Sequence, residues 1–261
     1  AAATVNEAGA SDGVAGAVMR GIRSHTIMDT LTGVVLNAVG DMESATPYNI
    51  WFDGAWDAPR LDDPAVCKGL ADYAGLLAAG PAHTFPIDWP DAHTPFNHGN
   101  PAFFVDASLF GPGYEDTENS LVAGKTGYMV LPPQEAGGNS QTGHWLWGLG
   151  IPKNAASKDA GWYFIQYMTN PANTAVLGTY SGGAPRLSSY EDAGYVDSLV
   201  PEYAATVADA MSDSRTTVVL TEGWLGDPAV AIVDVMLAIA NGEDPAAACA
   251  AGNEALLAEV S

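Results

Sequence analysis

The sequence predicts an α/β fold, because capped helical segments alternate along the chain with short apolar runs typical of buried strands. Of the 261 residues, 48% are hydrophobic and 15% are charged, a balance typical of a globular chain with a large core. Loops rich in proline, glycine and asparagine, at 132–143 and 181–186, interrupt this alternation. Such loops are natural crossing points between two lobes.

The clearest helix is expected over 61–80, which reads LDDPAVCKGLADYAGLLAAG. Either Asp62 or Asp63 can cap this helix, and Pro64 lies near its first position. Apolar residues recur along it at helical spacing and predict one buried face. Further helices are expected over 157–171, 227–242 and 244–261.

The helix expected over 157–171 has Ser157 as a candidate cap and an apolar face that includes Phe164 and Tyr167. The segment 227–242 is apolar nearly all round, which predicts a well-buried helix. Short apolar runs predict strands between the helices. These runs are AFFVD at 102–106, GYMVL at 127–131 and WLWGLGI at 145–151.

Acidic residues dominate the charge: 31 Asp and Glu against nine Lys and Arg give a formal net charge of −22. This excess repels nucleic acid phosphate and anionic lipid, so no nucleic acid partner or lipid surface is expected. The sequence has no run of 18 or more apolar residues, so we expect no transmembrane helix. Residues 1–13 lack the basic and apolar regions that mark a signal peptide.

Two cysteines, Cys67 and Cys249, lie far apart in the sequence. They match no metal-site spacing and no disulfide framework, although they could pair in an oxidising compartment. We expect both to be small buried hydrophobes.

Standard catalytic motifs are absent: there is no GxSxG, HExxH, P-loop or GxGxxG after a strand. His93 and His98 lie near Asp88 and Asp91, but their spacing matches no known ligand pattern. We therefore expect a polar surface loop there, and we expect no catalytic residue, metal or cofactor.

Several segments from Phe96 onward resemble, in the same order, the extracytoplasmic solute-binding proteins of ABC sugar importers. FNHGNPAFFVDASLF, VAGKTGYMVLPP and GHWLWGLGIPKNAASKDAGWYFIQYMTNP come first, followed by SGGAPRLSSYED and the closing NGEDPAAACAAGNEALLAEV. Upstream, DGVAGAVMRGIRSH is similar to a segment of the family with an Arg-Gly pair. This pair and the W-x-W pattern resemble the sequences of the branch of the family that carries polyols such as mannitol or sorbitol.

The resemblance implies a type II periplasmic-binding-protein-like α/β fold, mostly the second lobe with a short segment of the first. It assigns 1–142 to the second lobe, 143–187 to a crossing strand and a short first-lobe segment, and 188–261 to a helical return. Members of the family begin with a βαβ-rich part of lobe one that this chain lacks, so we expect a fragment.

The resemblance also implies the function, which is to bind a sugar or sugar alcohol between two lobes and deliver it to membrane permease subunits. The expected location is periplasmic or extracytoplasmic, either free or anchored to the membrane outside the cell. The full-length protein is expected to be a monomer without enzymatic activity.

Trp145 and Trp147 stand two residues apart, so in an extended chain both indoles point to the same face. One interpretation is core packing, and the other is a stacking surface for the apolar C–H face of a sugar. The resemblance places this pair on a crossing between lobes. We therefore expect at least one indole to line the cleft and the other to pack in the core.

Four more residues are candidates for ligand binding. Asp106 ends the apolar run AFFVD and matches the family's Asp, and it could instead cap the next turn. Arg20 and Arg186 can each bind two hydroxyl oxygens or form internal salt bridges. Trp224 lies in a loop ahead of an apolar helix and is a further aromatic candidate.

The alternative function is a carbohydrate-active hydrolase that uses acidic residues. Two carboxyl groups facing each other about 5–10 Å apart would favour that enzyme. Aromatic residues with one Asp or Arg would favour the binding protein.

Overall fold

The computed structural model describes residues 1–40, 50–53, 57–81, 87–89, 91–134, 136–145, 147–180, 183–212, 214–216 and 227–260. These residues form two compact units. Unit 1 contains residues 1–106, 130–144 and 213–261, and unit 2 contains 107–129 and 145–212. The lobe assignment made from the family resemblance stays a prediction, because these units are defined by contacts within this chain alone.

The described residues of unit 1 contain two pairs of short parallel strands. β1 (Ala15–Val18) pairs with β2 (Pro101–Phe104), with Val18 opposite Phe104. β3 (Thr142–His144) pairs with β4 (Ser214–Thr216). Short helices α1 (Ala2–Gly9) and α4 (His93–Asn97), with the 3₁₀ turns Ala10–Asp12 and His25–Ile27, complete this part of the unit.

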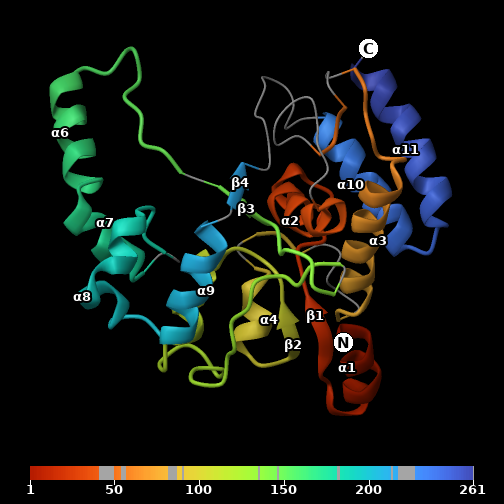
Figure 1. Ribbon diagram of the computed structural model, residues 1–261, viewed down its shortest axis with the longest axis horizontal. Helices are drawn as coiled ribbons and strands as arrows, with labels where there is room; N and C mark the ends of the chain where they lie inside the picture. The colour runs from red at the N-terminus through yellow and green to blue at the C-terminus, as the bar shows by residue number, and fades with distance from the viewer. Residues whose placement is uncertain are drawn as a thin grey trace. The chain divides into compact units, whose positions relative to one another are not determined.

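The core of unit 1 lies among four helices that Figure 1 shows packed together. They are α2 (Met28–Val39), α3 (Pro64–Ala78), α10 (Asp227–Ala240) and α11 (Pro245–Val260). α2 and α3 approach closely at Gly69, where an added Cβ would lie 2.7 Å from the Cα of Val35. Because Gly69 has no side chain, the two helices can approach closely and their apolar residues pack against one another.

The four predicted helices are found, although Ser157, which precedes the helix Lys158–Met168, makes no capping hydrogen bond. Asp63, rather than Asp62, caps α3 by accepting a hydrogen bond from the Ala65 backbone N–H at 2.9 Å. Asp244 caps α11 through the Ala247 N–H at 3.0 Å. α10 is as buried as its composition predicts, with Ile232, Val233 and Met236 fully enclosed.

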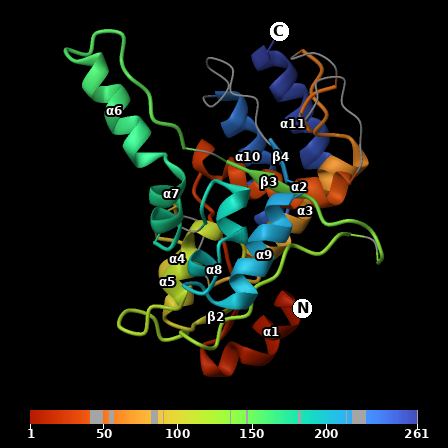
Figure 2. The same cartoon turned by 60° about the vertical axis from the view of Figure 1, so that its left-hand side comes forward.

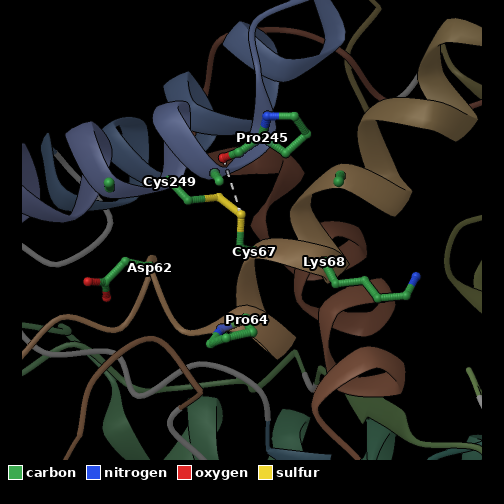
Figure 3. Close-up of a pocket in the computed structure, with 9 residues that line it drawn as sticks. Asp62, Pro64, Cys67, Lys68, Pro245 and Cys249 are labelled. Carbon is green, nitrogen blue, oxygen red and sulfur yellow. Dashed lines mark hydrogen bonds between the residues drawn. A yellow bond between two sulfur atoms is a disulfide. The ribbon is translucent and has the colours of Figure 1, made fainter.

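The two cysteines form a disulfide, so the prediction of two free buried thiols was wrong. Cys67 on α3 and Cys249 on α11 have Cα atoms 5.9 Å apart (Figure 3). The two cysteines are 182 residues apart in the sequence, and the packing of the two helices brings them together. Their spacing in the sequence therefore could not predict the bond. A shallow hollow beside the bond is lined mostly by carbon atoms, with Asp62 and Lys68 at its edge.

Unit 2 is helical in the residues described. Its longer helices are α6 (Lys158–Met168), α7 (Pro171–Gly178) and α9 (Pro201–Ser212). Shorter turns are α5 (Gly111–Tyr114), α8 (Ala193–Val196) and the 3₁₀ segments Ser108–Phe110 and Leu187–Glu191. A small core of tyrosines and aliphatic residues, centred on Tyr195 and Tyr203, lies among α7, α8 and α9 and includes no residue of α6.

Only the first of the three predicted strands is found, as β2. Residues 127–131 form no strand, because the Tyr128 carbonyl accepts a side-chain hydrogen bond from Thr206 at 3.3 Å instead of joining a ladder. The described residues of 145–151 form no strand either, and pairing stops at His144. Gly148 and Gly150 weaken a strand there because they offer no side chain to pack.

Candidate functional site

Arg20 is the centre of a buried polar cluster in unit 1. It is 1% exposed, yet its guanidinium is well paired. Nε donates to Asp106 Oδ2 at 2.7 Å, and Nη2 donates to Asp106 Oδ1. Nη1 donates to Asp29 Oδ1 at 2.8 Å and to the Thr26 carbonyl at 2.6 Å. One guanidinium therefore joins two carboxylates and a backbone turn.

The parallel strand pair explains why Arg20 meets Asp106. Val18 lies opposite Phe104 in the register of β1 and β2, and the two charged residues each follow by two positions. Because parallel strands end at the same edge, both side chains emerge together there. In open α/β sheets, ligands bind at this carboxyl edge. Asp29 reaches the same edge from the first turn of α2.

The buried hydroxyl groups of Tyr73 and Thr30 lie next to the cluster and stabilise the backbone at Arg20. The Tyr73 hydroxyl donates to the Arg20 carbonyl at 2.8 Å and lies 3.3 Å from Thr30 Oγ1. Burial raises the pKa of Tyr73 far above its ordinary value, so its hydroxyl stays protonated. The main chain at Arg20 is therefore held by a hydrogen bond from α3.

The charges of the cluster stabilise one another. Burial alone would lower the pKa of Arg20, but the hydrogen bond and charge of Asp106, with the charge of Asp29, raise it. Asp88 is a third carboxylate near this edge and accepts a hydrogen bond from Thr26 Oγ1 at 2.6 Å. Burial would raise the pKa of Asp88, but hydrogen bonds from Thr26 and Trp89 and the charge of Arg20 lower it.

The members of the cluster differ in their access to solvent. The side chains of Arg20 and Asp106 are 2% and 0% exposed, whereas that of Asp29 is 24% exposed. Of these three side chains, that of Asp29 is the one accessible to solvent, and its carboxylate oxygens can accept hydrogen bonds from hydroxyl groups.

The remaining predicted site residues lie apart from this cluster in the chain. Trp145 and Trp147 belong to unit 2, where they are 42% and 92% exposed. Within unit 2 neither indole is buried, so the expected core packing of one of them is not found there. Arg186 donates to the Thr169 carbonyl at 2.7 Å on the surface of unit 2. Trp224 lies outside the described residues.

The sequence prediction missed Asp29, Thr26, Tyr73 and Asp88. The available signal was the rarity of basic residues: an Arg that follows apolar residues needs acidic partners if it is buried, and the chain has 31 acidic residues. The described residues contain no group of three or more His, Cys, Asp or Glu that could hold a metal ion. Among the described residues, no helix combines the length and apolar character needed to cross a membrane.

Solved structures of similar fold define the class. One is an ABC transporter solute-binding protein from Agrobacterium radiobacter in complex with ribitol (TM-score 0.75, 20% identity, covering 96% of this chain and 61% of that one). Another is a maltose-bound protein from T. maritima (TM-score 0.77, 18% identity, covering 97% and 62%). The fold is therefore that of type II periplasmic-binding-protein-like α/β proteins, as the sequence predicts.

The sequence profile of the family "Bacterial extracellular solute-binding protein" matches residues 32–175. The chain belongs to this family. A curated relative, the mannitol-binding protein of Pseudomonas aeruginosa, is 29% identical over 169 residues, which are 62% of this chain and 36% of the relative. The chain thus spans about a third of that relative's length.

Proposed function

We propose that this chain is part of the substrate-binding component of an ABC importer and binds a sugar or sugar alcohol. Family membership supports a binding role. The sequence relative is described as mannitol-binding, and the two solved structures carry ribitol and maltose. These ligands share rows of hydroxyl groups, which both donate and accept hydrogen bonds.

The observation that carries the proposal is the Arg20 cluster at the carboxyl edge of β1 and β2. The Asp29 side chain is partly exposed, and its two oxygens can accept hydrogen bonds from neighbouring hydroxyls. Arg20 holds Asp29 in place through Nη1 and is itself held by Asp106. In this proposal Asp29 contacts the ligand, and Arg20 and Asp106 form the base of the site.

Aromatic residues supply the second part of the proposed recognition. Trp145 and Trp147 expose indole surface on which the C–H face of a sugar can stack. Arg186 and Trp224 stay proposed as further ligand contacts. The proposed partners are the membrane permease subunits of the importer, and the proposed location is extracytoplasmic. The Cys67–Cys249 disulfide is consistent with an oxidising compartment.

The family and the relatives above are described as binding proteins, and no geometry in the described residues favours the alternative of a hydrolase. Both carboxylates of the cluster, Asp29 and Asp106, bind the same guanidinium. A general acid instead needs a carboxyl group with a raised pKa.

Thermal unfolding with ribitol, mannitol, sorbitol and maltose tests the proposal. A ligand at a hundredfold excess over its Kd stabilises the folded chain by about 2.7 kcal/mol. For a chain of this size, that corresponds to a rise in Tm of roughly 5–10 °C. Absence of a shift with every compound would overturn the proposal that this chain binds them.

Two matched pairs of variants locate the site. Asp29→Asn removes one charge at the cluster, and Asp62→Asn removes one from an exposed position on the approach to α3. Trp147→Ala and Trp162→Ala each remove one exposed indole. We expect Asp29→Asn and Trp147→Ala to abolish the ligand-induced shift and the two controls to retain it.

A further inference from the structure

The Cys67–Cys249 disulfide is open to solvent on one side. Cys67 is partly exposed, whereas Cys249 is 1% exposed. The hollow beside the bond has a volume of about 380 Å³, and both cysteines belong to its lining (Figure 3). A water molecule occupies about 30 Å³ in the liquid, so the hollow has room for a small organic molecule. Such a molecule can reach the sulfur of Cys67.

The rest of the lining does little to shield the bond. Most of its other side chains are short, namely Pro64, Ala71, Pro245, Ala246 and Ala250. Asp62 and Lys68 lie at the edge, and the Lys68 ammonium is paired with Asp72 at 2.9 Å. An incoming reagent therefore meets carbon surface and no large side chain.

The helix α11, which carries Cys249, has few buried contacts besides this bond. Three of its 16 residues are buried: Ala248, Cys249 and Leu256. One of the three is the bonded cysteine and another is its neighbour, so Leu256 is the large aliphatic side chain among them. Leu257, the next residue, is 42% exposed. Because most helical stability in proteins comes from packing, α11 depends strongly on its few attachments.

The other attachments of α11 are local. The Leu61 N–H donates a hydrogen bond to Asn253 Oδ1 at 2.8 Å. Gly252 packs closely on α10, where an added Cβ would lie 2.0 Å from Val235 Cγ2. α11 lies beside α10 in Figure 1 and in Figure 2, and the exposed residues 241–244 connect the two helices. The disulfide is thus the covalent link between α11 and α3, and α11 can move at this connection once the link is broken.

We propose that the Cys67–Cys249 bond is a reducible latch, through which a small thiol in the surroundings controls the docking of α11 on α3. A thiolate of the reagent attacks Cys67 Sγ and forms a mixed disulfide with it. The Cys67–Cys249 bond breaks, and Cys249 Sγ leaves with the electron pair and takes a proton from water. A second thiolate of the reagent then attacks the mixed disulfide. The reagent is oxidised to a disulfide, and both cysteines are reduced. This inference does not depend on the proposed sugar ligand.

The first test measures access to the bond. Dithiothreitol is added to the native chain, and the appearance of free thiols is followed over time. We expect the rate to rise in proportion to the dithiothreitol concentration, because the reagent attacks the folded protein. Ala250→Leu places a larger side chain in the hollow and should slow reduction at least about tenfold, since exchange depends on access to the sulfur.

Ala251→Leu is the matched control, because Ala251 is also exposed on α11 but does not line the hollow. It should be reduced at the wild-type rate. A rate that does not depend on the dithiothreitol concentration would show that the chain must unfold before the bond is reached, and would overturn the proposal. Equal rates in the two variants would also overturn it.

The second test measures the release of α11. Amide exchange is compared between α11 (residues 245–260) and α2 (residues 28–39), in the oxidised and the reduced chain. We expect the ratio of the α11 rate to the α2 rate to rise at least about tenfold on reduction, because α11 opens while α2 stays folded. Cys67→Ala/Cys249→Ala should show the higher ratio without reductant, and its ratio should not change when dithiothreitol is added. An unchanged ratio in a chain whose two thiols are free would show that the bond stabilises unit 1 as a whole, and would overturn the latch.

Discussion

Replacing Arg20 by Met should destabilise unit 1 strongly. The substitution keeps an unbranched side chain of similar length and removes the guanidinium. Asp106, whose side chain is 0% exposed, then loses the bidentate partner that neutralises it. Asp29 is 24% exposed and can recover hydration from solvent, so most of the cost arises at Asp106.

The expected magnitude follows from the burial of the pair. Removing one partner of a buried ion pair costs about 3–5 kcal/mol, because the other charge remains without compensation. Replacing both partners, as in Arg20→Met/Asp106→Leu, leaves no buried charge and should recover most of that loss. The two single variants and the double variant form a cycle that isolates the interaction.

Urea unfolding followed by circular dichroism measures these differences. The chain provides a matched control: Arg23 pairs with Asp234 in the same bidentate geometry, but the two side chains are 62% and 43% exposed. Arg23→Met should change stability little, because exposed pairs are hydrated with or without the partner. An equal loss in Arg20→Met and Arg23→Met, or a double variant no more stable than Arg20→Met, would refute the role of burial.

Three further predictions concern unit 1. Cys67→Ala/Cys249→Ala should lower the free energy of unfolding by about 2–5 kcal/mol, because a cross-link over a long loop restricts the unfolded chain. Urea unfolding midpoints with and without reductant check this. A wild-type midpoint that does not change with reductant would contradict it. Gly69→Ala should cost about 1–3 kcal/mol, since its Cβ would lie 2.7 Å from Val35 Cα, whereas Gly75→Ala, with nothing within 4 Å, should not destabilise α3. The pKa of Asp88 is lowered in the folded state, so its contribution to stability is present above the unfolded value of about 3.9 and is lost as pH falls through the folded value. The stability difference between wild type and Asp88→Asn should therefore shrink below about pH 4, and a difference that grows in acid would show the opposite sign.

The sequence by itself determined four of the helices, one strand and the family. Asp63 and Asp244 mark the starts of α3 and α11, because a cap depends on residues two or three positions away. The apolar composition of 227–242 was enough to predict a buried helix, and the run AFFVD was enough to predict β2. The order of the motifs identified the family, and with it the α/β fold class.

Tertiary structure alone decided which distant residues meet. Arg20 and Asp106 are 86 positions apart, and only the register of β1 on β2 brings them together. The Cys67–Cys249 bond depends in the same way on how α11 packs on α3. The exposure of α6 could not be predicted from the sequence either. An apolar pattern shows which face of a helix is suited to packing, but not whether other residues of unit 2 cover that face. Contacts between distant segments depend on packing and register, and the local sequence determines neither.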